Sequence, residues 1–112
     1  MQRLINQPPS TIKLDINELL LLSNYITKNI DFYSSNTSAL IIKRWHVIEL
    51  YTKIEKGITK IIWTKKKYSL KVNECEKHCM SLLFQHRECN GYMIVISEQL
   101  IKGLIKINSN EA

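Results

Sequence analysis

The segment from residue 39 to residue 56 constrains the fold most, because its apolar side chains recur every three or four residues. That spacing is typical of an amphipathic α-helix. We expect one helix over residues 39–56, with Gly57 as its C-terminal cap and lysines near its negative end. The side chains expected along its inner face are Leu40, Ile41, Arg44, Val47, Ile48, Tyr51 and Ile54.

Three further helices are expected from the same kind of spacing. They cover residues 18–30, 74–88 and 93–107. Asn17 and Asn73 stand directly before the first two of these helices and are typical N-cap residues. The polar residues 34–38 separate the first helix from the long one, and residues 92–96 also fit a short strand.

Two segments favour strands. Residues 11–16 alternate between apolar and polar side chains, and residues 58–72 are rich in β-branched and aromatic types. We expect a hairpin over the second segment, with lysines 65–67 at or beside its turn. The expected fold class is therefore α+β and helix-dominated, with two helix pairs, a short N-terminal strand and a central β-hairpin.

Two parts of the chain resemble each other. Residues 14–18 and 70–74 share a strand end followed by Asn-Glu, at an offset of 56. Such self-similarity is typical of a duplicated supersecondary unit, although this pattern also recurs by chance because caps draw on few residue types. The expected boundaries are one domain over 1–112, half-repeats over 11–57 and 68–108, and flexible tails over 1–10 and 108–112.

The net charge of the chain is +6, with an isoelectric point near 9.3. A basic balance indicates an acidic partner, such as nucleic acid, an anionic membrane surface or an acidic protein. Compositional drift is an alternative source of the lysines. The chain is rich in Ile, Lys and Asn, which AT-rich genomes encode preferentially.

Other features of the composition bear on localisation. The most apolar run, residues 19–22, is far shorter than the roughly 20 residues that a membrane-spanning helix needs. The N-terminus has no apolar signal core, and three cysteines are an odd number for a disulfide framework. We therefore expect a cytoplasmic protein with no membrane among its partners.

A basic segment with interleaved aromatic residues is the strongest candidate binding surface. Such a segment can track a phosphate backbone and stack on bases. The alternative is a strand edge that lysines protect against pairing with other strands. The candidate residues, which include part of the long helix, are Lys43, Arg44, Trp45, Lys60, Trp63, Lys65, Lys66, Lys67, Tyr68 and Lys71.

Cysteine and histidine residues cluster near the expected third helix. The members are Cys75, His78, Cys79, His86 and Cys89, with His46 as a ligand that could be recruited from elsewhere. A zinc site is the functional interpretation. His86 lies seven residues beyond Cys79, about 10 Å along a helix, so all five side chains cannot meet at one metal ion. We expect these side chains to contribute to packing, with no metal and no cofactor.

The sequence shows no Gly-rich phosphate loop and no paired acid and base with an orienting group. We expect a small non-enzymatic protein-binding module that acts as a regulator, inhibitor or assembly subunit. The alternative is a basic DNA- or RNA-binding protein that uses residues 58–72 and the helix over residues 39–56. The expected core residues are Leu22, Ile26, Leu40, Val47, Tyr51, Leu82, Leu100 and Leu104.

Overall fold

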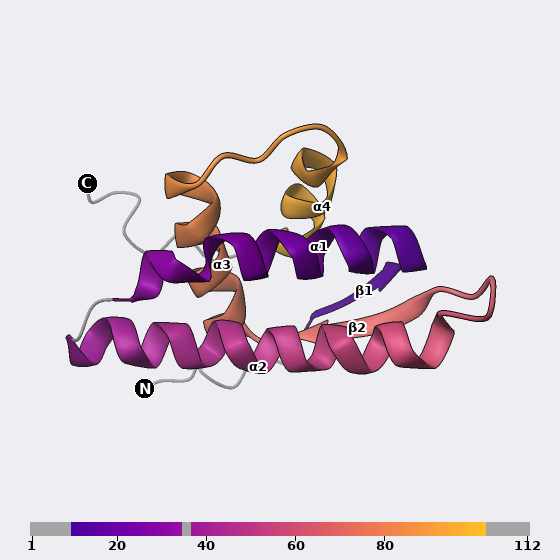
Figure 1. Ribbon diagram of the computed structural model, residues 1–112, viewed down its shortest axis with the longest axis horizontal. Coiled ribbons are helices and arrows are strands. Elements are labelled where there is room, and N and C mark those ends of the chain that lie inside the picture. The colour runs from indigo at the N-terminus through magenta and orange to yellow at the C-terminus, as the bar shows by residue number, and fades with distance from the viewer. Residues whose placement is uncertain (1–9, 35–36, 103–112) are drawn as a thin grey trace.

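The computed structural model describes residues 10–34 and 37–102, which form α-helices, one 3-10 helix and a two-stranded sheet (Figure 1). In chain order the elements are β1 (Ser10–Leu14), α1 (Ile16–Asn29), η2 (Ile30–Tyr33), α2 (Ser38–Ile61), β2 (Tyr68–Val72), α3 (Glu74–His86) and α4 (Tyr92–Leu100). The expected α+β, helix-dominated class is confirmed.

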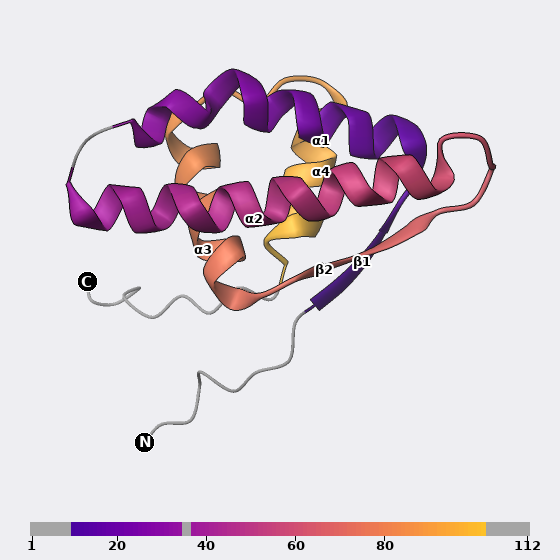
Figure 2. The ribbon, with the colours of Figure 1, turned by 60° about the horizontal axis from the view of Figure 1, so that its bottom comes forward.

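The helices form two layers. The helices α1 and α2 run antiparallel and side by side, as both ribbon views show (Figures 1 and 2). Behind them, α3 packs against α2 and α4 packs against α1, while β2 lies along α2. This arrangement covers one side of α2 and leaves its opposite side open to solvent.

The sheet joins two segments that are far apart in the sequence. Strand β1 pairs antiparallel with β2, with Ile12 opposite Leu70 at the centre of the register. The expected hairpin over residues 58–72 is therefore wrong in its first half, because residues 58–61 continue α2. Ile54, Ile58 and Ile61 keep helical spacing, and this local period outweighs the strand preference of β-branched residues.

The expected C-terminal cap at Gly57 is also wrong, because α2 runs through this residue to Ile61. The ring of Tyr68 packs directly on the helix backbone here. A Cβ atom at position 57 would lie 2.5 Å from Cδ2 of Tyr68, a distance that real Cβ contacts essentially never show. Glycine stands in the middle of this helix because only glycine leaves room for that ring.

The inner face of α2 differs from the expected one. Its buried side is made by Val47, Leu50, Ile54, Gly57 and Ile61. Arg44, Leu40 and Tyr51 are only partly buried, and the two isoleucines assigned to the inner face, at positions 41 and 48, are exposed. Helix α2 carries more apolar residues than one face can hold, so spacing alone did not decide which of them the core would cover.

Two helices begin with the same cap. The side chain of Asp15 accepts a hydrogen bond from the backbone N–H of Glu18, and the side chain of Glu18 accepts one from the backbone N–H of Asp15, both at 2.9 Å. Asn73 and Glu76 repeat this capping box at the start of α3, so the expected cap at Asn73 is confirmed. The expected cap at Asn17 is wrong, because the reciprocal pair forms two residues earlier.

Several other boundaries shift. The first strand begins at residue 10 and ends at 14, and α1 ends at 29, where a 3-10 turn follows. Helix α3 stops at His86, and residues 92–96 belong to a helix rather than a strand. Helix α4 ends at Leu100. Leu104, the rest of the expected fourth helix after residue 102, and the expected tails apart from Ser10 lie outside the described residues.

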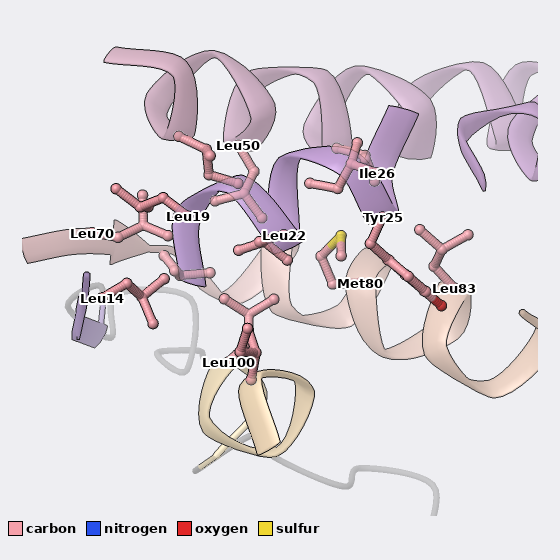
Figure 3. Packing of buried hydrophobic residues seen from close by; sticks show 14 of the residues in the cluster. Leu14, Leu19, Leu22, Tyr25, Ile26, Leu50, Leu70, Met80, Leu83 and Leu100 are labelled. Atoms are coloured by element: carbon pink, nitrogen blue, oxygen red, sulfur yellow. The ribbon is translucent and has the colours of Figure 1, made fainter. Parts of the chain in front are cut away.

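One hydrophobic cluster unites all of these layers (Figure 3). It draws buried side chains from both strands, η2 and all four α-helices of the described chain. Among the expected core residues, Leu22, Ile26, Val47 and Leu100 are buried. The others within the described residues, Leu40, Tyr51 and Leu82, are partly buried at the edge of the cluster.

Candidate binding surfaces

The ten candidate residues separate into two groups. Lys60, Trp63, Lys65, Lys66, Lys67, Tyr68 and Lys71 lie around the loop of residues 62–67, which joins α2 to β2. Lys43, Arg44 and Trp45 lie in the N-terminal half of α2. From Trp45 to the end of the helix at Ile61 the axial distance is about 24 Å, at 1.5 Å per residue. The structure therefore holds two separate surfaces where the sequence predicted one.

We call residues 62–67 the Trp63 loop. Its backbone is fixed by Thr64, whose N–H and hydroxyl both donate to the carbonyl of Ile61, at 2.8 and 3.1 Å. The hydroxyl of Thr64 also accepts the N–H of Lys66 at 3.1 Å. The loop is thus an ordered continuation of the helix end, from which Ile62 and Trp63 project with 42% and 91% of their surface exposed.

Two of the candidate side chains are engaged in holding the fold. Tyr68 fills the space over Gly57, and Nη1 of Arg44 donates to the carbonyl of Tyr33 at 3.0 Å. The second bond ties the start of α2 to the end of η2. Both groups therefore contribute to the packing of the fold.

The sequence interpretation identified only Trp45 of an exposed apolar surface on α2. It consists of Ile41, Ile42, Trp45 and Ile48, which are 44%, 58%, 60% and 41% exposed, and we call it the α2 face. The indole N–H of Trp45 donates to Oε2 of Glu49 at 3.1 Å, so the ring lies beside an acidic rim. The available signal was the surplus of apolar residues in the helix, which exceeds what one buried stripe requires.

Charges elsewhere on α2 are paired with neighbouring elements. Nζ of Lys53 lies 2.9 Å from Oε1 of Glu76, a carboxylate that is almost fully buried. Glu55 accepts a hydrogen bond from the hydroxyl of Ser23 at 2.7 Å. These contacts join α2 to α3 and to α1, so they belong to the packing of the helices.

The cysteine and histidine residues do not converge. In the part of the chain that the structure describes, no three His, Cys, Asp or Glu side chains are close enough to hold a metal ion. Cys75 is exposed, Cys79 is buried, and the His86 ring stacks on Phe32 with centroids 5.1 Å apart. Burial raises the pKa of the Cys79 thiol to about 11. At neutral pH this group is therefore a thiol, which is a poor nucleophile.

A groove beside α1 contains few reactive side chains. It is lined by Asn17, Leu20, Leu21, Ser23, Asn24, Thr27 and Tyr51. Tyr51 is the only titratable residue of that lining. The lining contains no paired acid and base.

Comparison with known protein families, curated proteins and solved structures finds no match to this chain. Among the described residues, no helix is both long enough and apolar enough to cross a membrane.

Proposed function

We propose that this chain is a small non-enzymatic module that docks on a partner protein through the α2 face, as a regulator, inhibitor or assembly subunit. The single observation that carries the proposal is the exposure of four large apolar side chains on one side of one helix. Contiguous exposed apolar surface of this kind is typical of protein interaction sites. The three free cysteines suit the reducing cytoplasm as the place of action.

The size of the α2 face suits the centre of an interface. Its four side chains are each about half exposed, and burying apolar surface contributes about 25 cal/mol per Å². Association itself costs about 4–15 kcal/mol. A stable complex therefore also needs contacts around the face, with Trp45 as the central anchor, because tryptophan is enriched among residues that dominate binding energy.

The occupant we propose is an amphipathic helix of the partner protein. Ile41, Trp45 and Ile48 stand at positions i, i+4 and i+7, which is the spacing that a second helix meets along a shared apolar stripe. Glu49 at the rim is exposed and acidic. We therefore expect a lysine or arginine of the partner to lie opposite it.

The test compares the unmodified chain with Trp45→Asp and with a matched control, Thr59→Asp. Thr59 is exposed on the same side of α2, about four turns further along. We expect unmodified protein and control to capture one stoichiometric protein from the native cell, with and without nuclease. The Trp45→Asp variant should lose it while keeping its circular dichroism spectrum and melting temperature. Direct binding to the purified partner, measured by calorimetry, should show the same pattern.

Three results would contradict the proposal. The first is equal capture by Trp45→Asp and by the unmodified chain. The second is a captured species that disappears with nuclease, because that would identify nucleic acid as the partner. The third is a stable homodimer in sedimentation velocity that Trp45→Asp dissolves, because a second copy would then occupy the α2 face.

A further inference from the structure

The Trp63 loop lies at one end of the long axis of the molecule in both ribbon views (Figures 1 and 2). Its exposed apolar tip, Ile62 and Trp63, has no role in the hydrophobic cluster. The hydrogen bonds of Thr64 fix the backbone beneath that tip. A tryptophan held in solvent by an ordered backbone is a feature that folding alone does not explain.

Positive charge surrounds this tip. Residues 56–73 contain six lysines and no acidic residue. Lys60, Lys65, Lys66 and Lys67 are all exposed close to the tip in the sequence. This segment alone therefore accounts for the whole net charge of +6, because the remaining ten basic and ten acidic residues of the chain balance.

The exposed side of the sheet extends this positive surface. Thr11 pairs with Lys71, and Lys13 pairs with Ser69. All four of these residues are exposed, whereas Leu70 and Val72, which alternate with them, are buried. Side chains that alternate along a strand point to opposite faces, so Lys13 and Lys71 share the outer face at the base of the loop.

We propose that the Trp63 loop and the adjoining sheet face bind the surface of an anionic phospholipid bilayer. Tryptophan prefers the boundary between lipid headgroups and acyl chains, where its ring is apolar and its N–H remains hydrated. Ile62 adds an aliphatic side chain to the inserted tip. The lysines around it meet the negative headgroups, and each lysine near such a surface strengthens binding about fivefold.

Nucleic acid fits the same charge less well, for reasons that the structure supplies. Binding of single strands uses several aromatic rings along a basic track. Here the ring of Tyr68 is packed on Gly57, and Trp45 lies about 24 Å from the end of α2 where the loop begins. Trp63 is left as one isolated ring, and its neighbour Ile62 cannot stack on a base.

Two structural roles for the lysines also fall short. Lysines near the end of α2 complement the negative end of its helix dipole, and lysines on a strand discourage edge pairing. Neither role accounts for the exposure of Ile62 and Trp63. Lys65, Lys66 and Lys67 stand before β2 begins, so they do not lie on the edge of that strand.

This site is independent of the α2 face, and it revises the sequence-based expectation that no membrane is involved. A peripheral contact needs no spanning helix. The inner leaflet of the plasma membrane is negatively charged, which agrees with a cytoplasmic protein. With its two surfaces at opposite parts of α2, the chain would hold a partner protein close to a membrane.

The first experiment uses Trp45→Phe, which leaves Trp63 as the only tryptophan of the chain. Its fluorescence is recorded with vesicles of phosphatidylcholine alone and with vesicles that also contain phosphatidylserine. We expect a blue shift only with the anionic vesicles, quenching by lipids brominated in the upper acyl chain, and a loss of the signal as salt screens the charges. An unchanged spectrum with anionic vesicles would overturn the proposal.

The second experiment measures vesicle affinity by co-sedimentation for two variants of equal net charge. Lys65→Ser/Lys66→Ser should lower the affinity about 25-fold, from two lysines at about fivefold each. The control Lys28→Ser/Lys102→Ser changes two exposed residues outside the loop, and Lys28 lies in the last turn of α1 at the opposite end of the molecule. The control should bind almost as the unmodified chain does. Equal losses in both variants would show that net charge alone drives binding and would overturn the site.

Oligonucleotides provide the competing ligand. If duplex or single-stranded oligonucleotide shifts the Trp63 emission and removes the protein from vesicles at physiological salt, the loop is a nucleic-acid site and the proposal fails. The Trp45→Asp variant should keep its vesicle affinity. The membrane site and the protein-docking site can therefore fail separately.

Discussion

Position 57 illustrates how one residue can be misread from sequence. Glycine near the end of an apolar period is typical of a helix cap, but it equally marks a place where another group approaches the backbone. The group here is the ring of Tyr68, which comes from the following strand. No local pattern around Gly57 reveals that neighbour, so the prediction of a cap was wrong for a tertiary reason.

Because of this contact, we expect Gly57→Ala to change the free energy of unfolding in the direction opposite to that seen in an ordinary helix. In an ordinary helix interior, Gly→Ala stabilises by up to about 1 kcal/mol. Here Gly57→Ala forces Cβ into the ring of Tyr68, and we expect the free energy of unfolding to fall by about 1–3 kcal/mol, as for other overpacked sites. Urea denaturation measures this loss. In a Tyr68→Ala background the same change should stabilise the protein, and a stabilising effect in the unmodified chain would contradict the close approach.

At the scale of elements, the chain repeats a unit made of a strand, a capping box and a helix. The first copy is β1 with α1 and the second is β2 with α3, at an offset of 58 rather than the 56 expected from the sequence. The glutamates of the two boxes also bind the helix of the other half. Glu18 accepts from the hydroxyl of Tyr92 in α4, and Glu76 pairs with Lys53 in α2. An internal duplication stays a prediction, and these crossed contacts favour it.

The caps can be tested against the residue that the sequence first suggested. Asp15→Ala and Asn73→Ala should each lower the free energy of unfolding by about 1 kcal/mol, because each leaves a helical N–H without its side-chain acceptor. Asn17→Ala is the matched control, since Asn17 is exposed two residues further along and makes no cap. Its cost should stay within about 0.5 kcal/mol. A larger loss for Asn17→Ala than for Asp15→Ala in thermal or urea unfolding would show that the helix begins elsewhere.

How far the sequence predicts the elements depends on whether their signal is local. Helical spacing and N-cap residues are local signals, so the four helices were predicted from the sequence with errors only at their ends. The pairing of Ile12 with Leu70 is not local. The sequence analysis therefore predicted that the second strand would pair within a hairpin, whereas residues 58–61 belong to α2. The lysine run and Trp45 were identified as candidates from the sequence. Ile41 and Ile48 of the α2 face were not, because they were expected to face a core that instead covers Leu50.

At the scale of the whole molecule, the burial of ionisable side chains should make the fold less stable at alkaline pH. Burial raises the pKa of Cys79 to about 11, and it also raises the pKa of Tyr33 and Tyr25 above their usual range. Tyr33 donates its hydroxyl hydrogen to the carbonyl of Cys79, and Tyr25 donates to the carbonyl of Arg87. These groups lie on α1, η2 and α3, so ionising any of them disturbs the packing between elements.

The direction of the pH effect follows from where each proton is held more tightly. The unfolded chain loses the Cys79 proton near its ordinary pKa of about 9, whereas the folded chain keeps it to about 11. The contribution of this thiol to the free energy of unfolding is therefore fully present below about pH 9. It is lost as the pH rises towards 11, by up to about 1.4 kcal/mol per pH unit for each such group. Both tyrosines act in the same direction from about pH 10.

Urea unfolding between about pH 8 and pH 11 should show this decline, and Cys79→Ala should make it shallower between about pH 9 and pH 11. Cys75→Ala removes an exposed thiol one turn away that raises the Cys79 pKa less than burial does, so it should change the decline much less than Cys79→Ala. Stability that stays constant or rises over this range, or a decline that both variants flatten equally, would show that Cys79 is not held in the buried position described.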